Sequence, residues 1–214
     1  MITSSAFSAR NVDKGFIFDV GGSMIFPNSN SQKYLLGLLN SKIVEEVLKI
    51  LNPTLNYQVG DIGKIPVIIE QKQKKIVENL TKTCIELSKL DWNSFETSWD
   101  FSIHPLISVI AKNQMLFDDT TNIDIAECYM CWENECNDCF NELKSNEEEL
   151  NRIFIEIYGL QDELSPEEED KDVTVRKADL QRDIRSLLSY AVGCMFGRYS
   201  LSTEGLVYAG GEWD

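Results

Sequence analysis

Four of the six cysteines form two closely spaced pairs whose thiols could bind a metal ion. Two residues separate Cys128 from Cys131, two separate Cys136 from Cys139, and four lie between the pairs. Thiolates are good tetrahedral zinc ligands, but zinc ribbons usually place a dozen or more residues between their pairs. On one α-helix these four residues fall within an arc of roughly 140°. The spacing leaves open a zinc-bound structural domain and a buried stripe of small apolar thiols, and it favours the stripe.

The other groups that could perform acid–base or nucleophilic chemistry form no recognisable catalytic motif. His104, the only histidine, precedes Pro105, so we expect it to close a turn or to pack under an aromatic ring rather than to join a triad. The carboxylate runs at residues 147–149 and 167–170 could act as acid and base or hold a metal ion. Runs this dense are more typical of a solvated face. The sequence contains no glycine-rich phosphate-binding loop.

The polar loop at residues 52–58 is the best candidate for recognition of another molecule. Thr54, Asn56 and Gln58 lie in it. Asn and Gln side chains can form paired hydrogen bonds with an adenine edge, and Thr can contact either base of a pair. A plain polar turn explains the same residues equally well.

Strand-like and helical patterns together predict an α+β fold that is mostly helical. Residues 15–27 resemble two strands around Gly21-Gly22, and residues 54–69 a loop followed by a strand in which Ile65, Val67 and Ile69 alternate. Apolar residues at three- and four-residue steps predict helices at 32–51, 70–90, 123–158 and 176–196, with a short helix or strand at 106–117.

Several residues mark where these helices should begin and end. Asn40-Ser41 is expected to divide the first helix, with Ser41 capping its second part. Gly159 and Gly197 should end the last two helices. Ser165, followed by Pro166, has the sequence of a further helix start.

The 214 residues can form one large domain or two small ones. We expect four segments, at 1–69, 70–117, 118–172 and 173–214. No apolar run reaches membrane-spanning length and no signal peptide is evident, so we expect a cytoplasmic protein with reduced cysteines. An apolar strand-like stretch ending six residues before the C-terminus also suggests a fragment of a longer protein.

Charge is distributed unevenly along the chain. Residues 1–75 hold nine Lys and Arg against six Asp and Glu, net +3, whereas residues 118–172 hold three against nineteen, net −16. DNA-binding proteins usually present a basic stripe. If this chain binds DNA, the first third must do so and the acidic stretch must face away.

Residues 34–67 resemble the closing part of a target-recognition domain, as found in type I restriction specificity subunits and type IIG-like adenine methyltransferases. The leucine-rich helix, Asn40-Ser41, the polar loop, Gly60-Asp61-Ile62 and Ile65-Pro66-Val67 carry the resemblance. Residues 73–80 resemble the helical spacer that follows such domains. Three later strings, at residues 151–164, 172–186 and 190–211, resemble the adenine-specific methyltransferase of BREX phage-exclusion systems.

This resemblance implies a longer enzyme that transfers a methyl group from S-adenosylmethionine to N6 of adenine. The family's catalytic motif, Asn-Pro-Pro-Tyr or a close variant, is absent, since Asn52-Pro53 is followed by Thr54-Leu55, and so is its glycine-rich cofactor motif. The resemblance therefore implies that the methyltransferase domain lies upstream. It also implies that this chain, without catalytic residues or a cofactor of its own, is inactive alone.

The leading hypothesis is a DNA-recognition and spacer fragment whose partners are double-stranded DNA, the upstream methyltransferase domain and other defence-system proteins, with no membrane. Thr54, Asn56 and Gln58 would contact base edges. The cations expected to contact phosphates are Arg10, Lys14, Lys33, Lys42, Lys49 and Lys64. The main alternative is that the acidic segment is a protein-interaction module or a DNA mimic.

Overall fold

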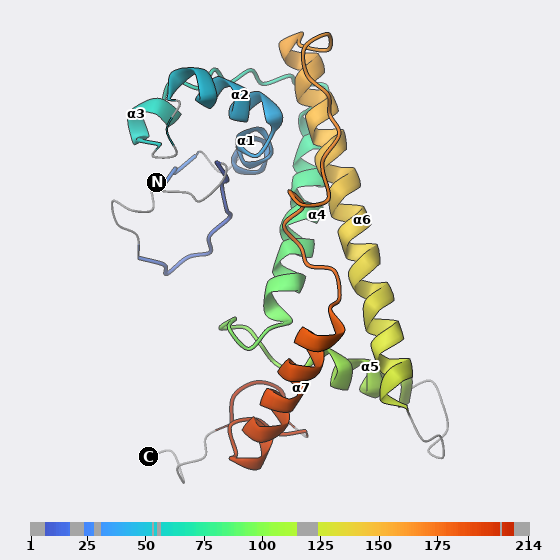
Figure 1. The fold of residues 1–214 in the computed structure, drawn as a ribbon. Helices are drawn as coiled ribbons and strands as arrows, with labels where there is room; N and C mark the ends of the chain where they lie inside the picture. Colours follow the sequence, from blue (N-terminus) through green and yellow to red (C-terminus); the bar gives the residue numbers. More distant parts are fainter. Residues whose placement is uncertain are drawn as a thin grey trace. The chain divides into compact units, whose positions relative to one another are not determined.

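The computed structural model describes residues 7–17, 24–27, 31–52, 54, 57–114, 124–201 and 203–207, and these residues form seven helices (Figure 1). The helices are α1 (Gln32–Leu39), α2 (Lys42–Leu51), α3 (Val59–Ile62), α4 (Lys74–Asn93), α5 (Pro105–Gln114), α6 (Ile125–Tyr158) and α7 (Leu180–Met195). No helix in the described ranges is long and apolar enough to cross a membrane.

The α+β prediction is wrong, because the described residues contain helices and no strand. Of the first expected strand pair, residues 15–17 and 24–27 are irregular, and residues 18–23 lie outside the described residues. The second expected strand is replaced by the short helix α3 and an irregular stretch in which Ile65 is buried. Val67, Ile68 and Ile69 in this stretch are exposed.

Two tyrosine hydroxyls explain why the stretch at residues 66–70 needs no partner strand. The Tyr34 hydroxyl donates to the Ile68 carbonyl (3.0 Å) and accepts from the Glu70 amide (3.4 Å). The Tyr158 hydroxyl donates to the Pro66 carbonyl (2.5 Å) and accepts from the Ile68 amide (3.2 Å). Backbone groups must find hydrogen-bond partners, and here side chains supply the bonds that a sheet would provide.

Compact packing divides the chain into two units. The first comprises Met1–Glu86 with Leu143–Asp172, and the second comprises Leu87–Glu142 with Val173–Asp214. Helices α4 and α6 each contribute residues to both units.

The core of the first unit is formed by α1, α2, the first part of α4 and the last part of α6. Tyr34 packs edge-on against Phe154, with ring centroids 5.4 Å apart. Gly37 allows α1 to approach α4 closely, because a Cβ at this position would lie 2.6 Å from Thr81 Oγ1. The most deeply buried side chains around them include Leu38, Ile43, Val44, Leu48, Val77, Leu150 and Ile153.

The second unit contains an aromatic cluster and a partly buried ion pair. Phe101, Tyr190 and Tyr199 pack together, and the last two rings stack at 5.0 Å between centroids. Arg176 binds Asp91 through Nε (3.1 Å) and Nη2 (3.0 Å), and its guanidinium lies 3.5 Å above the Phe95 ring. These contacts tie the irregular stretch before α7 to the end of α4.

The predicted division at Asn40-Ser41 and the predicted glycine ends agree with the structure, whereas the predicted starts at residues 70 and 176 come four residues before α4 and α7 begin. Residues 32–51 divide at Asn40-Ser41 as expected, but the Ser41 hydroxyl donates to Leu38 O (2.7 Å) and does not cap α2. Gly159, with φ +68°, ends α6, and the Gly159 and Leu160 amides donate to the Glu156 and Ile155 carbonyls. Gly197, with φ +75°, follows α7.

No helix begins at Ser165, and the chain remains irregular until α7. The Glu167 amide does donate to Ser165 Oγ (3.3 Å), so the local capping contact is partly present. The acidic side chains that follow instead make contacts with α2 and α6. Tertiary contacts therefore override a local helix signal at this point.

Candidate nucleic-acid interface

The N-terminal segment lies along α1 and positions Arg10. The Asn40 side chain accepts from the Ala9 amide (2.9 Å) and donates to the Ala9 carbonyl (3.1 Å), and Gln32 donates to the Asn11 side chain (3.0 Å). Both neighbours of Arg10 are thus attached to α1, the helix that carries Lys33.

The same segment also contacts the predicted recognition loop. Phe7 packs edge-on against Tyr57, with centroids 5.5 Å apart. Asn56 lies outside the described residues. Thr54 is exposed, but its amide and hydroxyl both donate to Asn52 Oδ1 (3.0 and 2.6 Å), so this side chain already supports the turn.

Asp61 closes the loop from the other end. Its Oδ2 accepts from the Asn52 side chain (2.9 Å) and from the Gln58 amide (3.1 Å). These two hydrogen bonds, the Asn52 bond above all, lower the pKa of the Asp61 carboxyl. The Gln58 residue is exposed just before α3, where its backbone is fixed.

The six predicted phosphate contacts fall into two groups. Arg10, Lys14, Lys33 and Lys64 are exposed and form no ion pair with another described residue. Lys49 lies between Glu45 (2.9 Å) and Glu46 (2.7 Å), and the Glu46 hydrogen bond is the main cause of its raised pKa.

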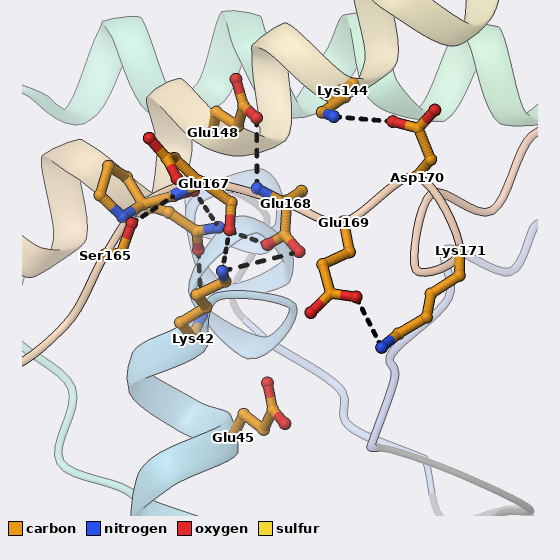
Figure 2. Close-up of polar contacts among 12 residues, drawn as sticks. Lys42, Glu45, Lys144, Glu148, Ser165, Glu167, Glu168, Glu169, Asp170 and Lys171 are labelled. Atoms are coloured by element: carbon orange, nitrogen blue, oxygen red, sulfur yellow. Dashed lines mark hydrogen bonds and ion pairs between the residues drawn. The ribbon is translucent and has the colours of Figure 1, made fainter.

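Lys42 also has partners, which come from the acidic segment at residues 165–172 (Figure 2). Its Nζ donates to the Glu167 carbonyl and lies 3.9 Å from Glu168 Oε2. The Lys144 ammonium of α6 pairs with Asp170 (2.8 Å) in the same way. A DNA phosphate at Lys42 or Lys49 would have to displace a carboxylate, whereas one at Lys33 or Lys64 would not.

Asn151 organises these contacts and was not singled out from the sequence. This buried side chain accepts from the Lys42 amide (3.0 Å) and donates to Glu168 Oε1 (2.6 Å) and Pro166 O (3.3 Å). The available signal was an amide followed by Phe154 and Ile155 on the same helix face, since buried polar groups need partners.

Two neighbouring carboxyl groups in this region, those of Glu147 and Glu168, have raised pKa values. Burial, with a smaller contribution from the nearby Glu168 carboxylate, raises the pKa of Glu147 to about 7, and Arg10 opposes this shift. Burial likewise raises the pKa of Glu168, against the influence of Lys42.

All four paired cysteines lie on the single helix α6, as the spacing favoured. Cys128 and Cys136 are buried, Cys139 is half-buried and Cys131 is exposed, and all are free thiols. Burial raises the pKa of Cys136 to about 12, which disfavours the thiolate that a metal would bind. Among the described residues no three potential metal ligands form a group.

His104 occupies the structural position expected for it. Its Nδ1 accepts from the Leu106 amide (3.3 Å) at the start of α5, and its ring lies 6.0 Å from that of Tyr190. Burial lowers the pKa of His104 to about 4, although nearby Asp183 opposes the shift. The imidazole is therefore neutral at pH 7, and in the part of the chain that the structure describes no nucleophile is hydrogen-bonded to it.

Comparison with known proteins tests the resemblance. The chain is 47% identical over its whole length to the adenine-specific methyltransferase PglX of Lacticaseibacillus casei, and 34% identical over 98% of its length to the adenine-specific methyltransferase BrxX of Escherichia coli. This chain is homologous to the BREX adenine-specific methyltransferases. It spans 17% and 18% of the lengths of those two relatives. No protein-family model matches it.

Proposed function

We propose that this chain is a DNA sequence-recognition and spacer segment of an N6-adenine-specific DNA methyltransferase that uses S-adenosylmethionine. The observation that carries the proposal is the assembly of the N-terminal segment, α1 and the loop before α3. In this assembly the segment that carries Arg10 is bonded to α1, which carries Lys33, and contacts Tyr57 of the polar loop, in a homologue of adenine methyltransferases.

Within this assembly the proposed roles follow from the contacts. Lys33 and Lys64, and with them Arg10 and Lys14, would contact phosphates, which position a protein on DNA without reading the sequence. Gln58 and Asn56 would reach base edges, with Thr54 supporting the turn. Lys42 and Lys49 would contribute less, because carboxylates already neutralise them.

A direct test is DNA binding by the full chain in a salt series. We expect Lys33→Gln and Lys64→Gln each to weaken binding to double-stranded DNA, and each to reduce the slope of log affinity against log salt by about 1. Lys82→Gln is the matched control, because Lys82 is an exposed α4 lysine paired with Glu86 (3.4 Å). Gel shift or fluorescence anisotropy would measure both quantities.

Base readout requires a separate measurement. Gln58→Ala should leave the salt slope unchanged but relax the preference among sequences selected from a random DNA pool, by about 1–3 kcal/mol at one position. If the wild type and all variants bind equally, or if the chain does not bind DNA at low salt, the proposal is wrong.

The alternative of an acidic interaction module stays a prediction. This alternative concerns the acidic stretch at residues 118–172. Within the first unit, Lys42, Lys144 and Lys171 already pair with three of its carboxylates, those of Glu168, Asp170 and Glu169. A basic partner would therefore meet fewer free carboxylates than the sequence alone suggests.

A further inference from the structure

The 165–172 segment contacts α2 and α6 of the first unit but belongs to no helix or strand (Figure 2). Five of its eight residues are Glu or Asp. Isolated polar contacts hold it, since the Glu168 amide donates to Glu148 Oε1 (3.2 Å) and Lys144 pairs with Asp170 (2.8 Å). Segments held by exposed polar contacts, with few buried apolar side chains, open at a lower free-energy cost than helices in a core. This segment can therefore leave α2 while the core of the first unit stays folded.

The segment covers the N-terminal end of α2. Lys42 is the first residue of that helix, and its Nζ donates to the Glu167 carbonyl and lies 3.9 Å from Glu168 Oε2. The N-cap residue Ser41 makes no side-chain capping hydrogen bond, and the buried Asn151 accepts from the Lys42 amide instead (3.0 Å). Amides at a helix N-terminus carry partial positive charge. The ammonium and the helix end together attract an anion, and Glu168 supplies one from within the chain.

Lys49, further along α2, is paired in a different way. Its partners Glu45 and Glu46 lie one turn away on α2 itself (2.9 and 2.7 Å), so these charges stay together whenever the helix is formed. The partners of Lys42 lie outside any helix, more than a hundred positions later in the sequence. The pairing of Lys42 can therefore be broken without disturbing α2.

The position of Glu168 is unfavourable for a carboxylate. Asn151 donates to its Oε1 (2.6 Å), and the Lys42 ammonium stabilises its charge. Burial nevertheless raises the pKa of this carboxyl, with a smaller contribution from Asp172. Glu147 on α6 is a further carboxyl, and its pKa is raised partly because Glu168 is near. One ammonium 3.9 Å away thus opposes like charges and partial burial, so Lys42 can exchange this carboxylate for another anion.

We propose that the 165–172 segment is an autoinhibitory cover that occupies Lys42 until a DNA phosphate displaces it. The inference rests on the proposed DNA recognition, because DNA is the competing polyanion. Binding of a phosphate to Lys42 releases a counterion from the DNA, a gain that the internal Glu168 does not bring. The contact that the segment blocks reads no base, so the cover lowers the affinity for every DNA sequence alike.

The first test removes the internal anion. We expect Glu168→Gln to bind a mixed-sequence DNA duplex about fivefold more tightly than the wild-type chain at low salt, because Lys42 is then free for a phosphate. Glu163→Gln is the matched control: it makes the same charge change at an exposed residue that forms no ion pair among the described residues. It should change the affinity less than about twofold, since exposed charges are screened. Fluorescence anisotropy would measure all three affinities.

The gain must depend on Lys42. In a Lys42→Gln background, adding Glu168→Gln should tighten DNA binding less than about twofold, because no ammonium remains to be uncovered. Glutamine at position 168 keeps an oxygen that can accept from Asn151, so Glu168→Gln should melt near the wild-type temperature.

Hydrogen exchange tests the cover without any substitution, and it decides the matter if Glu168→Gln does not fold. Adding DNA to the wild-type chain should accelerate exchange of the amides of residues 167–172, as they leave α2 and α6. The amides of α4 should not exchange faster. Mass spectrometry of peptides from the chain, with and without the duplex, would measure this.

Two results would overturn the cover and leave the proposed function standing, provided that Lys33→Gln still weakens binding. One is a gain from Glu168→Gln that equals that of Glu163→Gln or persists in the Lys42→Gln background, which would mean a general charge effect. The other is unchanged or slower exchange at residues 167–172 when DNA binds. Absence of DNA binding by both the wild type and Glu168→Gln would overturn the cover and the proposed function together.

Discussion

Lys33 and Lys42 are the same residue type in neighbouring helices, yet only one is available to a phosphate. Lys42 is held by the Glu167 carbonyl and lies near Glu168, while Lys33 is exposed without an ion pair among the described residues. Sequence predicts which residues are cations. It does not predict that a segment more than a hundred positions later will neutralise one of them.

Glu147 offers a test of ionisation at the residue scale. Burial raises the pKa of its carboxyl to about 7. Between about pH 4.5 and 7, the folded state therefore keeps a proton on this carboxyl that the unfolded state has released. Stability contributed by this group therefore falls as pH rises through that window.

Replacing Glu147 with Gln removes the buried ionisation. We expect Glu147→Gln to raise the free energy of unfolding by about 1–2 kcal/mol at pH 8 and to change it little at pH 5. Urea denaturation at both pH values would measure this, with Glu156→Gln, an exposed carboxylate on the same helix, as the control. A gain of equal size at both pH values would contradict the assigned cause.

Single residues were predicted best where their neighbours in sequence fix their surroundings. His104 was expected to close a turn or pack against an aromatic ring, and it does both, because Pro105 starts α5 directly after it. Asn151 was missed, because its partners Lys42 and Glu168 lie far from it in sequence.

At the scale of elements, long periodic helices were predicted well and strands were not. The periodicity that predicted a helix at 123–158 comes from the helix itself, and α6 confirms it. An alternating stretch such as residues 65–69 becomes a strand only if another strand pairs with it. The sequence contains no signal that Tyr34 and Tyr158 would supply those hydrogen bonds instead.

The contact between α1 and α4 allows a test by paired substitution. Gly37→Ala would place a Cβ 2.6 Å from Thr81 Oγ1, a buried hydroxyl without a hydrogen-bond partner. Overpacking of this kind costs about 1–3 kcal/mol, which exceeds the gain of about 0.5–1 kcal/mol from replacing a helical glycine. We expect Gly37→Ala to lower the free energy of unfolding.

The second substitution should rescue the first. Thr81→Ala removes the clashing oxygen, so Gly37→Ala with Thr81→Ala should be more stable than Gly37→Ala alone. A double-mutant cycle from urea denaturation would give the coupling energy. If the effects of the two substitutions on the free energy of unfolding are additive, Thr81 Oγ1 is not the atom that the new Cβ meets.

On the scale of the whole chain, charge dominates the expected behaviour in solution. The net charge is −15, and like charges repel one another more strongly in the compact state. Salt screens this repulsion, whereas exposed ion pairs such as Lys82–Glu86 contribute at most about 1 kcal/mol each.

We therefore expect salt to stabilise the chain. The melting temperature should rise by a few degrees between 20 and 300 mM NaCl, and KCl should give the same shift if screening is the cause. Differential scanning calorimetry would measure both series. A melting temperature that falls with salt would show that ion pairs outweigh repulsion.

The family was also recognisable from the sequence, while the fold class was not. Strings such as residues 151–164 carry the resemblance to BREX methyltransferases, and the relatives confirm it along the full chain. Recognising such strings needs no knowledge of which segments pair. Predicting the fold class requires knowing which segments pair. The strand predictions were wrong because the sequence does not show this pairing.

The tyrosine contacts at residues 66–70 have a consequence for how this sequence can diverge. Tyr34 and Tyr158 bind main-chain atoms, which every residue provides, and the side chains of Val67, Ile68 and Ile69 are exposed. Mutational drift should therefore be tolerated at positions 67–69, with proline excluded at 68, where the amide is needed. We expect Tyr34 and Tyr158 to be retained instead. The residues that evolution keeps constant would then lie far in sequence from the segment whose backbone they hold.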